Sequence, residues 1–138
     1  RFMVIGGAGP SFEGVTLDVP ESVADRLEFL GQVDDEGRLF EVFRHARFLL
    51  FPSYYEASPL PPIEAMTFGC PVVSSRIASL VERCGEAAVY CDADDPCSIQ
   101  AAIDKVMQSE QTWSHLSNKQ YSWASQTSSL LDICEAVA

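Results

Sequence analysis

The sequence predicts an α/β fold: a Rossmann-like parallel sheet flanked by helices. Three observations support this prediction. Five short segments are apolar almost throughout, as in strands covered on both faces, and helix-like segments lie between them. Connections are short, with Gly and Pro at their ends. The chain has 138 residues, of which 47% are hydrophobic, so we expect one domain, spanning residues 1–138, with its own core.

The first part of the chain should form two strands. Residues 2–7 (FMVIGG) are an apolar run ending in glycines, which predicts a strand followed by a loop over 8–14. Pro20 lies near the start of a short helix or turn, and a second strand is expected over 28–33.

A helix and a third strand come next. The helix is expected over 34–46, where Asp34 or Asp35 can cap the start. Its apolar face is formed by Leu39, Phe40, Val42 and Phe43. The strand over 47–53 is apolar almost throughout, so we expect it to be central and covered on both faces.

A short helix should follow over PPIEAMTFG. Pro61 and Pro62 suit its first turn, Gly69 suits the residue just past its end, and Pro71 stops it.

The remaining elements alternate in the same way. Strands are expected over 71–75 and 87–92, with a short helical turn over 80–87 between them. A helix over 94–108 has Asp94 or Asp95 as its cap, Pro96 at its first position and a stripe of Ile99, Ile103, Val106 and Met107. One broken or two short helices are expected over 111–137.

Composition excludes several classes of partner. The net charge of −11 and the lack of a basic run argue against nucleic acid, although an anionic small ligand can still bind to backbone N–H groups. The chain contains no run of 18 apolar residues, so no membrane span is predicted. The chain starts without Met and directly enters a strand, so we expect a fragment of a longer protein.

Cysteine and histidine offer no metal site. Five cysteines, without a C-x-x-C pair, favour reduced thiols in a cytoplasmic protein. His45 and His115 have no ligand-like spacing and are expected to lie on surfaces or helix faces. We expect no metal and no cofactor.

The corner after the third strand is the best candidate site. In sheets of this kind ligands bind at the carboxyl ends of strands, and Glu56 and Glu64 flank the corner there. Free N–H groups and the dipole of the following helix favour an anion, and Ser58 adds a hydroxyl. Glu64 is also explained by the helix dipole alone, and Glu56 by an ordinary solvated loop.

The glycine-rich segment after the first strand is weaker. Gly7 and Gly9 form a G-x-G, but Phe12 occupies the third position of the dinucleotide fingerprint. An NAD-dependent oxidoreductase is therefore disfavoured. Gly6 and Gly7 can still let a ligand approach the strand end closely.

Residues 51–75, FPSYYEASPLPPIEAMTFGCPVVSS, resemble the E-x7-E segment of retaining GT-B glycosyltransferases of family 4, the glycosyl transferases group 1. The flanks FMVIGGAGP, EFLGQV and LVERCGEAAVYCDADDP resemble the family in the same order. The resemblance covers nearly the whole chain and weakens after about residue 110. It implies the C-terminal, nucleotide-sugar-binding half of a two-domain enzyme, lacking the N-terminal acceptor domain and the first strand segment.

The resemblance also implies roles for individual residues. Glu64 matches the glutamate that holds the ribose hydroxyls, and Glu56 matches the one beside the donor sugar, implicated in catalysis or sugar positioning. The backbone that faces sugar and diphosphate matches Ser58, Pro59, Leu60 and Pro61, and the loop that meets the base matches Gln32 and Val33. The implied reaction is glycosyl transfer with retention, without an obligatory metal. Its partners are a nucleotide-diphosphate sugar and a glycan or lipid acceptor.

Two departures from the family pattern are visible. The usual G-F-G is Ala57-Ser58-Pro59 here, which removes one backbone donor because proline has no N–H. The family's Arg and Lys for the diphosphate lie upstream of Arg1. A GT-B nucleotide-sugar 2-epimerase and a non-catalytic nucleotide-binding module remain alternatives. Peripheral association of the full-length protein with the inner membrane also stays open.

Overall fold

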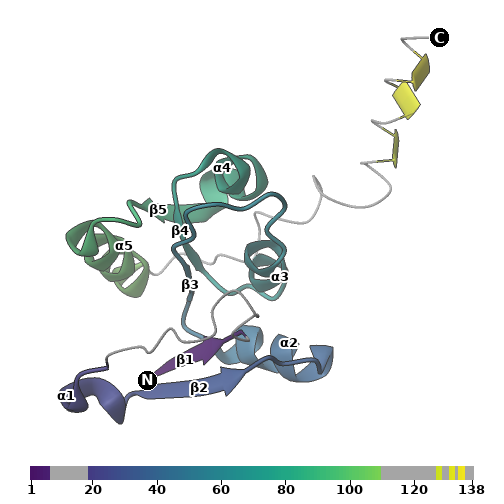
Figure 1. The fold of residues 1–138 in the computed structure, drawn as a ribbon. Helices are drawn as coiled ribbons and strands as arrows, with labels where there is room; N and C mark the ends of the chain where they lie inside the picture. The colour runs from purple at the N-terminus through teal and green to yellow at the C-terminus, as the bar shows by residue number, and fades with distance from the viewer. Residues whose placement is uncertain (7–18, 110–126, 129–130, 133, 136–138) are drawn as a thin grey trace. The chain divides into compact units, whose positions relative to one another are not determined.

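A computed structural model describes residues 1–6 and 19–109, and, near the C-terminus, 127–128, 131–132 and 134–135 (Figure 1). The chain divides into two compact units, Arg1–Leu39 and Phe40–Ala138. The expected loop over 8–14 and most of the expected helical segment over 111–137, including His115, lie outside the described residues. The C-terminal residues that are described are helical, as predicted.

The Arg1–Leu39 unit contains a parallel strand pair. Strand β1 (Phe2–Ile5) pairs with β2 (Leu27–Gly31), and the short helix α1 (Glu21–Ala24) precedes β2. Gly6 follows β1 with φ of 137°, a conformation that favours glycine, and its N–H donates to the Gly31 carbonyl at 2.9 Å. Both predicted strands and the short helix are therefore present.

Helix α2 (Glu36–His45) begins where the sequence predicts, and the division between the units falls within it. The Oδ1 atom of Asp35 accepts a hydrogen bond from the Arg38 N–H at 3.1 Å, so Asp35 caps the helix. Phe43 is buried, and the Phe40 ring lies 4.7 Å from that of Phe68.

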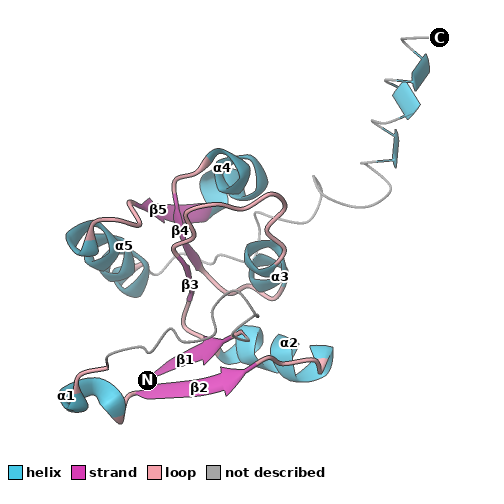
Figure 2. Cartoon of the chain, viewed as in Figure 1, coloured by secondary structure: helices cyan, strands magenta, loops and turns pink. Residues whose placement is uncertain are grey.

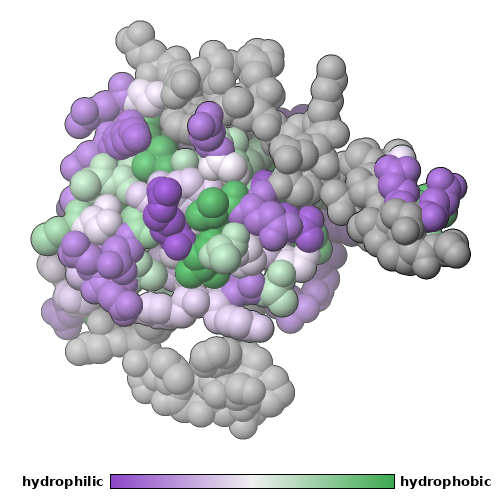
Figure 3. Space-filling model, turned by 90° about the horizontal axis from the view of Figure 1, so that it is seen from above, coloured by the Kyte–Doolittle hydropathy of each residue, from purple (hydrophilic) through white to green (hydrophobic). Residues whose placement is uncertain are grey.

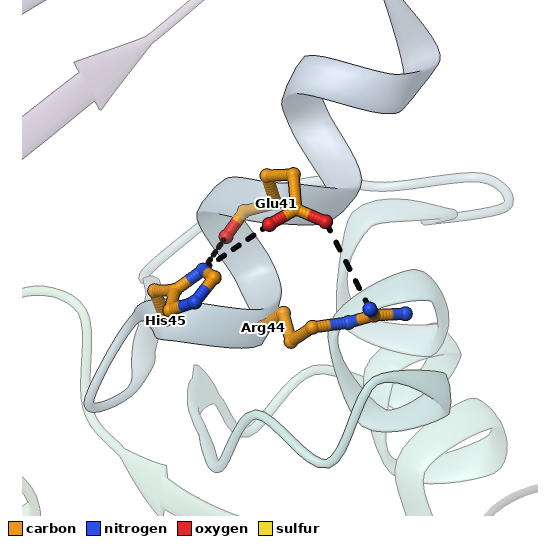
Figure 4. Close-up of polar contacts among 3 residues, drawn as sticks. All are labelled: Glu41, Arg44 and His45. Carbon is orange, nitrogen blue, oxygen red and sulfur yellow. Dashed lines mark hydrogen bonds and ion pairs between the residues drawn. The ribbon is translucent and has the colours of Figure 1, made fainter.

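The exposed side of α2 carries a small polar cluster (Figure 4). The Glu41 carboxylate lies 3.8 Å from Arg44 Nη1 and 3.5 Å from His45 Nδ1, and the same His45 nitrogen lies 2.8 Å from the Glu41 carbonyl oxygen. All three side chains are exposed, so the pairs add little stability. His45 is a helix-surface residue, as expected.

The Phe40–Ala138 unit contains a parallel sheet in the order β3-β4-β5, made of β3 (Leu49–Phe51), β4 (Val72–Ser75) and β5 (Ala88–Cys91). The prediction that the first of these strands is central does not hold within this three-stranded sheet. Within this sheet β3 lies at the edge and is half-buried, whereas every residue of β4 is buried. An apolar run indicates covered faces, but it does not indicate how many strands lie beside it. The five described strands thus form two parallel sheets.

Helices cover both faces of the β3-β4-β5 sheet (Figures 1 and 2). Helix α5 (Pro96–Gln108) lies on one face, and α3 (Pro61–Thr67) and α4 (Ala78–Cys84) lie on the other, with a 3₁₀ turn over Gly85–Ala87 before β5. One core cluster joins Val73, Val89 and Cys91 to α5. Its helical members are Ala102 and Val106, with Ile99 packed against them, whereas Met107, expected in the stripe, is 44% exposed.

The end of α3 follows the predicted capping pattern. Gly69 has φ of 76°, its N–H donates to the Met66 carbonyl, and the Cys70 N–H donates to the Ala65 carbonyl. These are the two bonds of a Schellman motif, which needs a left-handed residue after the helix. Gly69 supplies that residue without strain.

The structure resolves which aspartate caps α5. The Oδ1 atom of Asp95 accepts from the Cys97 N–H at 2.9 Å, and Pro96 occupies the first turn. We expect Asp95→Ala to lower the free energy of unfolding by about 1 kcal/mol, because the first turn loses its capping acceptor. Urea denaturation measures the loss, and faster hydrogen exchange at the first-turn amides locates it. The control Asp94→Ala should leave those amides protected; an equal effect would contradict the assignment.

Within the described ranges, no helix has both the length and the apolar character needed to cross a membrane. On the face shown in Figure 3, hydrophilic and hydrophobic side chains are interspersed.

Candidate functional site

Glu56 is held in place at the corner after β3. Its Oε1 atom accepts a hydrogen bond from the Ser53 hydroxyl at 2.8 Å, and the side chain is half-buried. The Ser75 hydroxyl, at the end of β4, donates to the Ser53 carbonyl. Two neighbouring strand ends therefore position this carboxylate, which does not behave as a free loop residue.

The loop that departs from the family pattern has ordinary backbone geometry. No non-glycine residue in the described ranges has positive φ, so Ala57 does not adopt the conformation that a glycine could adopt there. Pro59 is buried and has no N–H to donate. Leu60 is 60% exposed, and Ser58 is also exposed. The loop thus offers the Ser58 hydroxyl as its clearest polar side chain.

The start of α3 supplies fewer N–H groups than expected. Pro61 and Pro62 occupy its first two positions and carry no N–H, and the Glu64 N–H donates to the Leu60 carbonyl at 3.0 Å. Ile63 is the one residue among the first three helical positions that has an N–H. The helix is also short, with 7 residues, so an anion at this corner needs other donors.

Arg83 is the cation that sequence reasoning missed at this corner. It lies in the last turn of α4, and its Nη2 atom donates to the Ser58 hydroxyl oxygen at 3.0 Å. The two residues are 25 positions apart in the chain, and a single arginine in a helix carries no spacing pattern that would connect it to a loop. Only the packing of α4 beside α3 brings this guanidinium to the loop.

A cavity of about 600 Å³ was also missed. It lies at the carboxyl ends of β4 and β5 and is lined by Ser53, Tyr54, Arg76, Tyr90 and Asp92, among others. Its residues come from four separate stretches of the chain, none of which forms a recognisable motif.

The residues predicted for the donor site fall into two groups. Glu56, Ser58, Pro59, Leu60, Pro61 and Glu64 lie together around the corner between β3 and α3. Gly6, Gln32 and Val33 belong to the other compact unit, where Gln32 Nε2 donates to Asp34 Oδ1 at 2.7 Å and Val33 is half-buried. Gly7 lies outside the described residues. A site that combines the two groups stays a prediction.

The cysteines are free thiols. Cys70, Cys84 and Cys91 are buried, and Cys97 and Cys134 are exposed. Burial raises the thiol pKa of Cys70 and that of Cys84 to about 11, so neither is a thiolate near neutral pH. Within the described ranges, no three His, Cys, Asp or Glu side chains are grouped to hold a metal ion.

Comparison with known proteins identifies similar chains. Residues 1–109 match the family model described as Glycosyl transferases group 1. The chain is 34% identical over 113 residues to O-antigen chain mannosyltransferase B of Escherichia coli, covering 77% of this chain and 29% of that protein. It is 28% identical over 116 residues to D-inositol 3-phosphate glycosyltransferase of Acidothermus cellulolyticus, covering 78% of this chain and 25% of that protein.

A solved structure of sucrose-phosphate synthase from Thermosynechococcus elongatus has a similar fold. Its TM-score is 0.69 at 24% sequence identity, and the match covers 99% of this chain and 39% of that chain. This similarity confirms the α/β, Rossmann-like fold class. The chain spans less than a third of the length of the curated relatives described above.

Proposed function

Because this chain belongs to the group 1 glycosyl transferases, we propose that it forms the donor-binding part of a longer enzyme that transfers a sugar from a nucleotide-diphosphate sugar to an acceptor. We propose a GT-B architecture and transfer with retention at the anomeric carbon. The observation that carries the proposal is the corner itself, where Ser53 holds the Glu56 carboxylate at a strand's carboxyl end and Glu64 lies in the first turn of the next helix.

The two glutamates would have separate roles. A carboxylate accepts hydrogen bonds on both oxygens, so Glu64 is suited to bind the two vicinal ribose hydroxyls of the donor. Glu56, fixed by Ser53, would lie beside the donor sugar and stabilise positive charge that develops at the anomeric carbon. The two roles are supported by the resemblance to the family and by the positions of the two residues, one before and one after the Ser58–Pro61 loop.

The leaving diphosphate needs positive partners, and Arg83 is a candidate within this chain. Its guanidinium already donates to Ser58 Oγ at the loop, and arginine can bind a phosphate with two parallel hydrogen bonds. The Ile63 N–H and the Ser58 hydroxyl would add neutral donors. These groups would act together with basic residues that the family carries upstream of this segment.

We expect Arg83→Gln in the full-length protein to weaken binding of a nucleoside diphosphate about ten-fold, because one charge-assisted hydrogen bond is lost. Isothermal titration of the diphosphate and of the corresponding nucleoside separates a phosphate contact from contacts to the base and ribose. The nucleoside should bind equally well to both proteins. Arg47→Gln, which removes an exposed arginine between α2 and β3, is the control. Equal weakening of nucleoside and diphosphate would refute a phosphate role.

The identity of the donor sugar is a narrower proposal. Several relatives are named mannosyltransferases, so mannosyl donors are the first to test. The loop Ala57-Ser58-Pro59 lacks the glycines of the common pattern, so other sugars belong in the same panel.

A thermal-shift panel of UDP-, GDP- and ADP-sugars on the full-length protein tests the proposed function. One nucleotide series should raise the melting temperature, because a ligand that binds the folded state stabilises it by mass action. Transfer to an acceptor should follow with that donor. Epimerised nucleotide sugar without acceptor would assign a 2-epimerase instead, and no stabilisation by any series would reject donor binding.

We also propose that the 138-residue chain alone has no useful transferase activity, because acceptor contacts and the upstream basic residues would lie elsewhere in the enzyme. Turnover at normal rates by the isolated chain would reject this. A cytoplasmic location is proposed from the free, buried thiols, which suit a reducing compartment.

A further inference from the structure

The cavity at the carboxyl ends of β4 and β5 is separate from the proposed donor corner. It belongs wholly to the Phe40–Ala138 unit, and its walls come from the segment after β3, the ends of β4 and β5, and the first turn of α5. None of residues 56–64 lines it. Its volume of about 600 Å³ lies within the range of small-molecule sites, and the carboxyl edge of a parallel sheet is where such sites form.

Two tyrosines, Tyr54 and Tyr90, line the cavity. The Arg76 guanidinium lies 5.4 Å from the centre of the Tyr90 ring, so this cation is held over an aromatic face. Tyr54 is 68% exposed, but its hydroxyl is anchored: it lies 3.5 Å from the Ala93 carbonyl oxygen, and a hydrogen bond to Asp94 raises the pKa of the phenol. The tip of Tyr54 is thus restrained while its ring remains accessible.

The charges of the lining select the class of ligand. The lining contains two carboxylates, those of Asp92 and Asp94, and one guanidinium, that of Arg76, in a chain of net charge −11. This balance disfavours phosphate or another anion. Carboxylates accept hydrogen bonds from vicinal hydroxyls, a guanidinium donates to them, and the Ser98 hydroxyl adds a further polar group. An accessible tyrosine ring can pack against the apolar C–H face of a sugar.

We propose that this cavity binds one neutral pyranose unit of a glycan, with Tyr54 stacked on the sugar face and Arg76 and Asp92 bonded to its hydroxyls. The cavity holds the sugar chain during the transfer proposed above, and this role rests on that proposed function. Sugar binding itself does not depend on it. Ser53, which lines the cavity and also bonds to Glu56, connects the two sites.

The test measures binding of three methyl α-glycosides, those of mannose, glucose and galactose, to the full-length protein by saturation-transfer NMR titration. At least one should bind, and Tyr54→Ala should weaken its binding about ten-fold, because the contact between the aromatic ring and the sugar face is lost. Tyr55→Ala is the matched control: Tyr55 is the adjacent tyrosine, 83% exposed, and does not line the cavity.

Further variants guard against misfolding and locate the site. Tyr54→Phe keeps the ring and should bind the glycoside nearly as well as the unmodified protein. Arg76→Gln should weaken glycoside binding and leave nucleotide affinity unchanged. Glu64→Ala should do the reverse, which separates this cavity from the donor corner.

Three results would overturn the proposal: no glycoside binds, Tyr54→Ala and Tyr55→Ala have equal effects, or only Glu64→Ala abolishes the glycoside signal. In the last case the sugar lies in the donor corner, and the proposed function stands without this second site. Glycoside binding that is sensitive to Tyr54, in a protein that binds no nucleotide, would support the cavity and reject the proposed function. Binding of spermidine with no glycoside would assign a cation site instead.

Discussion

Glu64→Ala should weaken nucleotide binding to the full-length protein by about 2–4 kcal/mol, or roughly 30- to 700-fold in the dissociation constant, because two hydrogen bonds to a charged acceptor are lost. Glu64 is half-buried in the first turn of α3, where a carboxylate also interacts favourably with the helix dipole. The measurement must therefore separate ribose binding from helix stability.

A dideoxy ligand makes this separation. The unmodified protein should bind a 2′,3′-dideoxynucleoside diphosphate much more weakly than the normal nucleotide, whereas Glu64→Ala should bind both equally. Glu21→Ala removes a first-turn glutamate from α1 and controls for the dipole effect. If Glu64→Ala changes the melting temperature but not nucleotide affinity, the carboxylate has a structural role and the ribose assignment is wrong.

Glu56→Gln should lower kcat about 100-fold while changing nucleotide affinity little, because it removes the charge that we propose stabilises the transition state. The support for this role is the way in which hydrogen bonds hold the Glu56 carboxylate at the strand end. Ser53 holds one carboxylate oxygen at 2.8 Å, and Ser75 holds the Ser53 backbone, so the charge is preorganised.

The Ser53 contact can be tested in the same assay. Ser53→Ala should lower kcat about ten-fold with little change in KM, because the carboxylate keeps its charge but loses its orientation. Ser53→Thr, which retains the hydroxyl, should recover most of the rate. If Glu56→Gln raises KM and leaves kcat unchanged, the residue takes part in substrate binding alone.

Local signals predicted the elements well. Gly69 ends α3 where a left-handed residue was needed, and Asp95 and Pro96 begin α5, because caps depend on residues within one turn of each other. The helical stripe was less reliable: Val106 is buried but the adjacent Met107 is exposed, since the width of the apolar face depends on what packs against it.

The position of strands within the sheet could not be read from hydrophobicity. The apolar segment around β3 lies at the edge of its sheet, and the central strand is β4, which contains two serines, Ser74 and Ser75, that are fully or almost fully buried. Their hydroxyls donate to backbone carbonyls of the β3 segment, so burial leaves neither unpaired.

The candidate site likewise has features that the sequence predicted and features that only the tertiary structure shows. The amino-acid sequence alone located the corner between β3 and α3 and identified Glu56 and Glu64, because all of these lie within one short segment with a recognisable spacing. Only the tertiary structure brought Arg83 to Ser58, Ser75 to the Ser53 backbone, and Arg76 over Tyr90 at a cavity. Those contacts join residues from different elements, and they exist because the packing of helices on a parallel sheet brings distant parts of the chain to one edge.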